Sequence, residues 1–189
     1  MYEGLSKMFW GIFLATFSIN LGPIRILPTF VGFMIISSGI NTIYNEHKTD
    51  EFKKALDFSR ITIIIALFGG LIDFFTAGNY EYSLILQIWP IMLMIVELLM
   101  FYNFLLAIIK YFHSIGNLEV SERVVASSRL YMIIYISSIA FLSFVLLFNL
   151  RLDTLLAIVF VILRISLLVI ISGLKKDLIP NKPDDNQGM

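Results

Sequence analysis

Six long runs of apolar residues dominate this sequence, and each has about the length of a membrane-spanning helix. A helix needs roughly 20 mostly apolar residues to cross about 30 Å of hydrocarbon. These runs are too long for strands and show no alternation of apolar and polar residues, and a spanning backbone must satisfy its own hydrogen bonds. We therefore expect an all-α bundle with six transmembrane helices at residues 5–21, 26–44, 60–77, 82–112, 130–150 and 154–174.

The composition excludes the ordinary soluble classes. Hydrophobic residues make up 58% of the chain and charged residues 15%, with no cysteine, whereas a soluble domain carries about 25% charged residues. Because 14 basic residues balance 14 acidic ones, the net charge does not favour nucleic acid as a partner. We expect one integral membrane domain over residues 1–177, surrounded by the lipid bilayer, and a flexible cytoplasmic tail over residues 178–189.

The basic residues are distributed unevenly between the two sides of the predicted bundle. Eleven of them fall on the side that holds both termini and the connections at residues 45–59 and 113–129. Only Arg25 and Arg151 fall on the opposite side, and Arg164 lies within a span. Cytoplasmic loops carry the excess of Lys and Arg. The pattern therefore predicts three helical hairpins in a multi-pass protein of the cell membrane, with both termini in the cytoplasm.

The connection at residues 45–59 has two interpretations. It could form a short surface helix with Phe52, Ala55, Leu56 and Phe58 facing the headgroups, or a plain solvated loop. The sequence favours neither.

The first predicted hairpin carries a recognisable pattern, Asn20-Leu21-Gly22 followed by Leu27-Pro28-Thr29-Phe30-Val31-Gly32. It resembles the first hairpin of a group of uncharacterised small bacterial polytopic membrane proteins, whose pattern is an Asn-x-Gly turn and then Leu-Pro-Asp-Phe-Val-Gly. Thr29 stands where that aspartate is usual, so a role for the carboxylate does not carry over. The resemblance implies a small polytopic membrane protein and no assigned chemistry.

A looser likeness is to the substrate-binding subunits of energy-coupling-factor transporters. Those proteins are similar in size, with six helices and cytoplasmic termini, and often have small residues four apart on the first helix, as Gly11 and Ala15 are here. This likeness is one of fold only.

Two charged residues of opposite sign lie near the middle of predicted spans. Glu97 is in the fourth span and Arg164 in the sixth, at comparable depth. Since a charge at the bilayer centre costs about 2.5–3.5 kcal/mol on insertion scales, both side chains should face the bundle, where they could pair. The pair would then either build a solute or proton site or fix the helix register. Pro90 precedes Glu97 by one heptad, and its kink could open a cavity beside the carboxylate, or Trp89-Pro90 could mark the interfacial end of the helix.

A second group of charged residues lies at the predicted external rim: Arg25, Asp73, Arg151 and Asp153. They could surround an external opening, although a set of solvated, headgroup-level charges is the interpretation that the pattern favours.

The sequence contains no pattern typical of an enzyme or a cofactor site. Neither histidine has a second histidine three or four residues away, and cysteine is absent, so we expect no metal site. No phosphate-binding or dinucleotide-binding motif and no His-Glu-x-x-His motif occurs. We expect no catalytic residue, no cofactor and no enzymatic activity.

Two functional hypotheses follow from these features. In the first, the protein binds or transports a small solute through an intramembrane polar site at Glu97 and Arg164. In the second, it is a structural or regulatory subunit that acts through contacts with a membrane or cytoplasmic partner.

Overall fold

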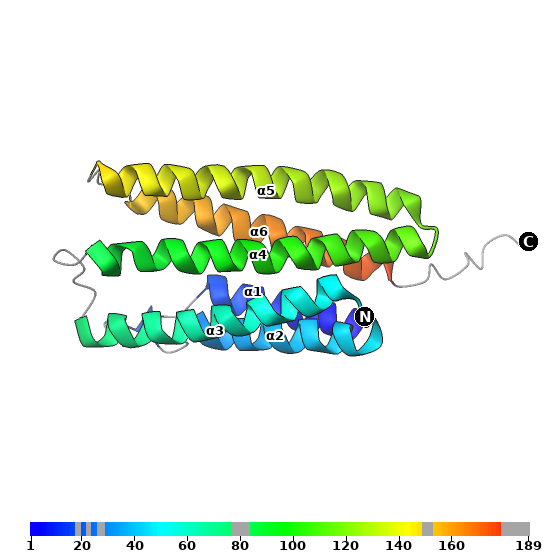
Figure 1. The fold of residues 1–189 in the computed structure, drawn as a ribbon, viewed down its shortest axis with the longest axis horizontal. Helices are drawn as coiled ribbons and strands as arrows, with labels where there is room; N and C mark the ends of the chain where they lie inside the picture. Colours follow the sequence, from blue (N-terminus) through cyan, green and yellow to red (C-terminus); the bar gives the residue numbers. More distant parts are fainter. Residues whose placement is uncertain (18–19, 22–23, 26–28, 77–83, 149–152, 179–189) are drawn as a thin grey trace, which may run out of the picture.

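Within the residues that it describes, the computed structural model has six helices that run along a common direction (Figure 1). The structure describes residues 1–17, 20–21, 24–25, 29–76, 84–148 and 153–178. The predicted cytoplasmic tail at residues 178–189 lies, apart from its first residue, outside the described residues. The helices are α1 (Tyr2–Thr16), α2 (Thr29–Glu46), α3 (Asp50–Thr76), α4 (Leu84–Ser114), α5 (Leu118–Leu147) and α6 (Asp153–Asp177).

Four helices are long and apolar enough to cross a membrane, within the part of the chain that the structure describes. They are α3, α4, α5 and α6, with candidate spans Asp50–Ile72, Trp89–Ser114, Leu118–Val145 and Ile158–Asp177. The first two helices are shorter, with 15 residues in α1 and 18 in α2. Between them lie two short paired strands, β1 (Asn20–Leu21) and β2 (Ile24–Arg25), antiparallel with Asn20 opposite Arg25.

Helices α1 and α2 pack against each other through glycines. Each helix buries residues at the spacing i, i+1, i+4, i+7, i+8 and i+11, starting at Gly4 in α1 and at Gly32 in α2. A Cβ atom on Gly11 would lie 2.7 Å from the backbone nitrogen of Ile36 and 2.8 Å from the carbonyl oxygen of Gly32. Small residues allow membrane helices to approach this closely, which is the packing role expected for them.

Two helices begin well before the predicted spans. The predicted connection at residues 45–59 is neither a separate surface helix nor a solvated loop, because α3 begins at Asp50. Phe52, Ala55 and Leu56 are buried in the core of the bundle, and Phe58 is partly buried against the same core. Buried residues three and four apart extend the helix beyond the apolar run, and the hydroxyl of Thr49 accepts a hydrogen bond from the backbone N–H of Phe52 at 3.4 Å.

The connection predicted at residues 113–129 is shortened in the same way. Helix α5 begins at Leu118, and the Asn117 side chain accepts a hydrogen bond from the backbone N–H of Val120 at 3.2 Å. Gly116 adopts φ 77°, a left-handed conformation that ends α4 and favours glycine. The turn between α4 and α5 is therefore only a few residues long.

One end of the bundle holds the N-terminus, the end of α6 and the turns that follow α2 and α4 (Figure 1). Ion pairs join the chain there, between the Met1 amino group and Glu46, between Lys110 and Glu51, and between Arg123 and Asp177. Glu97 and Arg164 lie away from this end, well inside the bundle.

Candidate functional site

Glu97 and Arg164 form an ion pair between α4 and α6. The Arg164 Nη2 donates a hydrogen bond to Glu97 Oε2 at 3.0 Å. The Glu97 side chain is only 3% exposed, and that of Arg164 is 19% exposed. Since a buried charge is tolerated when it is paired and hydrogen-bonded, this contact explains how both residues can lie in an apolar helix bundle.

Arg164 also contacts the end of α1. Its Nη1 donates a hydrogen bond to the carbonyl oxygen of Ala15 at 2.6 Å. This carbonyl is among the last four of α1, which have no partner within a helix, and a cation at a helix C-terminus is favourable. The guanidinium carbon lies 5.7 Å from the centre of the Phe33 ring of α2, a cation–π distance. Arg164 thus touches three other helices, α1, α2 and α4.

Two tyrosines of α5 complete the polar site. Tyr131 is 3% exposed and Tyr135 is 2% exposed, and their ring centres are 5.6 Å apart. Both hydroxyl groups lie within electrostatic range of Glu97 and Arg164. We call Glu97, Tyr131, Tyr135 and Arg164 the polar cluster.

The Tyr131 hydroxyl is buried and has no hydrogen-bond partner among the described residues. Most buried polar groups in proteins are hydrogen-bonded, so an unpaired hydroxyl is a place where a ligand or a water molecule could supply the missing acceptor.

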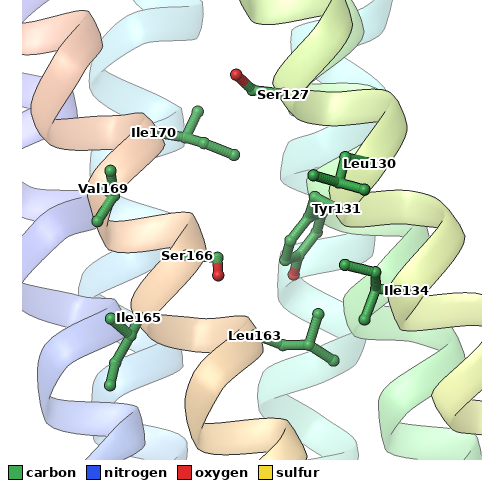
Figure 2. Close-up of a pocket in the computed structure, with 9 residues that line it drawn as sticks. All are labelled: Ser127, Leu130, Tyr131, Ile134, Leu163, Ile165, Ser166, Val169 and Ile170. Carbon is green, nitrogen blue, oxygen red and sulfur yellow. The ribbon is translucent and has the colours of Figure 1, made fainter.

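A groove lies beside the polar cluster, between α5 and α6 (Figure 2). Its volume is about 280 Å³, and Tyr131 lines it together with mostly apolar side chains. Figure 2 shows the Tyr131 ring extending from α5 into the space between the two helices, with Ser166 of α6 facing the same space.

The other predicted site residues are not seen to join this cluster. Pro90 lies within α4 and is exposed, and it does not line the groove. Arg151 lies outside the described residues, and the side chains of Arg25, Asp73 and Asp153 lie outside the part of the structure that we describe. The described residues include no group of three or more His, Cys, Asp or Glu side chains that could hold a metal ion.

Sequence reasoning did not single out Tyr131, Tyr135 or the Ala15 carbonyl. The tyrosines are four residues apart at the start of the span predicted at residues 130–150, which places them on one helix face. That spacing is the one signal that could have found them, because tyrosine in membrane proteins is otherwise typical of the interface. A backbone carbonyl carries no signal in the sequence.

Comparisons of this chain with protein-family models, with curated proteins and with solved structures found no match. The resemblance of the first hairpin to a family of small bacterial membrane proteins, and the likeness to transporter subunits, stay predictions. The function is therefore inferred from the chain's own residues.

Proposed function

We propose that this chain is a multi-pass protein of the cell membrane with six spans and both termini in the cytoplasm. The excess of basic residues on the side of the termini supports this orientation. The shortness of α1 and α2 is compatible with six spans, because the paired strands between them are extended. An extended chain rises about 3.3 Å per residue against 1.5 Å in a helix, so a short helix and an extended segment together cover more depth than the helix alone.

Within this architecture, the protein binds a small solute at the polar cluster.

 The observation that carries this proposal is the buried Tyr131 hydroxyl, which has no hydrogen-bond partner among the described residues although a buried ion pair lies beside it. A solute with an acceptor group would satisfy this hydroxyl. Arg164, which is 19% exposed, has five N–H donors, so a further acceptor can approach it as well.

Native mass spectrometry of the protein, extracted gently from the membranes of its own host, tests this function. We expect the wild-type chain to carry additional small-molecule mass. The Glu97→Gln and Arg164→Gln variants should lose this mass while remaining folded and monodisperse. An exposed substitution away from the cluster, Ser143→Ala in α5, is the control and should retain the mass. Equal ligand mass in the wild-type chain and in both glutamine variants would contradict the proposal.

A second candidate function is that of a structural or regulatory subunit. The contacts of Arg164 favour it, because this residue joins α4 to the end of α1 through two hydrogen bonds. Holding the bundle together would by itself account for the ion pair, with no ligand. In that case both single glutamine variants should unfold, and a paired apolar replacement, Glu97→Leu with Arg164→Met, should restore folding. The protein would then act through a membrane or cytoplasmic partner, which would co-purify with it.

A further inference from the structure

The groove between α5 and α6 is open toward the surroundings of the bundle. Leu130, Ile134, Ile165 and Val169 line it and are exposed, with Val169 67% exposed. Both helices are candidate membrane spans. Apolar side chains exposed on such helices face lipid, so the groove is open to the bilayer.

The groove lies in the cytoplasmic half of the predicted fifth and sixth spans. Tyr131 is the second residue of the span predicted at residues 130–150, and the exposed Arg129 lies two residues before it. Ser166 lies about 12 Å along the helix from the end of the span predicted at residues 154–174. A molecule that enters the groove from the bilayer would therefore have its polar head near the membrane interface and its apolar part in the hydrocarbon.

Two hydroxyl groups define the head that such a molecule needs. The buried Tyr131 hydroxyl has no partner among the described residues and is available to donate a hydrogen bond. The Ser166 hydroxyl donates to the carbonyl oxygen of Ile162 at 2.9 Å, so its oxygen remains free to accept one. A head group that accepts from Tyr131 and donates to Ser166 satisfies both, and a protonated carboxylic acid or an alcohol does this with one or two oxygen atoms.

The size of the groove limits the rest of the molecule. Its volume of about 280 Å³ lies just below the range of 300–1,000 Å³ that is typical of ligand pockets. It has room for a head group and one chain segment, with the remainder of the chain lying along the exposed side of the groove. A single chain fits these dimensions better than a whole two-chain lipid.

We propose that the groove between α5 and α6 binds a single-chain amphiphile from the bilayer, such as a fatty acid, with its head group between Tyr131 and Ser166. This inference rests on the proposed function, because it names the chemical class of the solute and its lateral path to the polar cluster.

Quenching of a fluorophore by a brominated fatty acid tests the proposal. The chain has no cysteine, so Val169→Cys introduces a single labelling site at the rim of the groove. Ile61→Cys on α3, also exposed but outside the groove, is the matched control. Dibrominated stearic acid should quench the label at position 169 saturably and in competition with stearic acid, and should quench the label at position 61 without saturation. Dibrominated octadecane, which lacks the head group, should quench neither label saturably.

The head-group assignment has its own variant. Tyr131→Phe keeps the ring and removes the hydroxyl, and the loss of one hydrogen bond should raise the half-saturating concentration about fivefold to tenfold. Equal quenching at the two labelled positions would overturn the proposal, because only lipid at the protein surface would then be seen. An unchanged half-saturation in Tyr131→Phe would overturn the placement of the head group.

Failure of this inference is distinguishable from failure of the proposed function. If the glutamine variants lose a bound solute in the mass spectrum but position 169 shows no saturable quenching, the groove proposal fails and the polar site stands. If saturable quenching is unchanged when both Glu97 and Arg164 are glutamine, the groove proposal stands and the role of the ion pair in solute binding fails.

Discussion

The interface between α1 and α2 and the interface between α5 and α6 are built in opposite ways. In the first, Gly39 is so close to the facing helix that a Cβ atom would lie 2.6 Å from the carbonyl oxygen of Gly4. In the second, branched side chains such as Ile134 and Val169 line a groove of about 280 Å³. Because helices in a membrane gain little from the hydrophobic effect, close packing is the main source of their attraction. The first interface is therefore suited to stability, and the second leaves space for a ligand.

Arg164 lies where these two regions meet, and its removal should have the largest effect. Arg164→Met would break the contacts with Glu97 and with the Ala15 carbonyl and leave the Glu97 carboxylate buried without its partner. We expect a loss of about 3–5 kcal/mol in the free energy of unfolding. Unfolding by a denaturing detergent, followed by circular dichroism, measures it.

The control for this variant is Arg129→Met, an exposed arginine of α5. It should change the free energy of unfolding by less than about 0.5 kcal/mol. Adding Glu97→Gln to Arg164→Met should recover part of the lost stability, because the unpaired charge is removed. Equal stability of the two methionine variants would show that the ion pair does not hold the bundle together.

A methyl group at the α1–α2 interface should have the next largest effect. Gly11→Ala places a Cβ atom against backbone atoms of Ile36 and Gly32, which cannot move without separating the helices. We expect a loss of about 1–3 kcal/mol in the free energy of unfolding, the range for overpacked sites. The same unfolding experiment measures it.

Gly173→Ala in α6 is the matched control, because a Cβ atom there would meet no other atom within 4 Å. Alanine favours a helix over glycine by up to about 1 kcal/mol, so this variant should be as stable as the wild-type chain or more so. If Gly11→Ala behaved like Gly173→Ala, the close packing of α1 and α2 would not contribute to stability.

The long helices could be predicted from the sequence because a continuous apolar run is a strong signal. Their true ends could not, because hydropathy detects the part of a helix that suits lipid and misses an amphipathic extension. Thr49 and Asn117, which accept hydrogen bonds from the first turns of α3 and α5, were the available signals for those ends.

Only the two charged residues of the polar cluster could be predicted from the sequence. Glu97 and Arg164 were identified because opposite charges at similar depth are costly unless they meet. Tyr131 was missed because its distinguishing feature is a buried hydroxyl with no hydrogen-bond partner among the described residues. That feature depends on packing in three dimensions. The groove was missed for the same reason, since no residue pattern encodes an incomplete contact between two helices.

A larger side chain in the groove should be tolerated, in contrast with the methyl group on Gly11. Ser166→Leu adds volume where α5 and α6 leave space. We expect a change of less than about 1 kcal/mol in the free energy of unfolding, together with loss of saturable quenching by dibrominated stearic acid. A destabilisation as large as that of Gly11→Ala would mean that the two interfaces are equally close-packed, and the comparison between them would fail.

The smallest expected effect is a pH dependence at the end of the α1–α2 interface, where His47 follows α2. The His47 ring packs 4.7 Å from the ring of Tyr111, and burial, with a further contribution from the N-terminal ammonium group, lowers the pKa of His47. An unfolded histidine has a pKa of about 6.5. The folded chain therefore binds fewer protons near this pH than the unfolded chain, and stability should fall as the pH is lowered through about 6.5 toward the folded pKa.

Replacing His47 isolates this contribution from that of the N-terminal amino group. Burial also lowers the pKa of the Met1 ammonium, so its contribution has the same sign, but it begins to be lost at a higher pH, near its ordinary value of about 8. In His47→Gln the Met1 contribution remains and that of His47 is absent. We expect Tm of the wild-type chain to fall more between about pH 7.5 and pH 5.5 than Tm of His47→Gln. If Tm changed with pH equally in the two proteins, the pKa of His47 would be the same in the folded and unfolded chains. The end of the α1–α2 interface at His47 would then not be shielded from water.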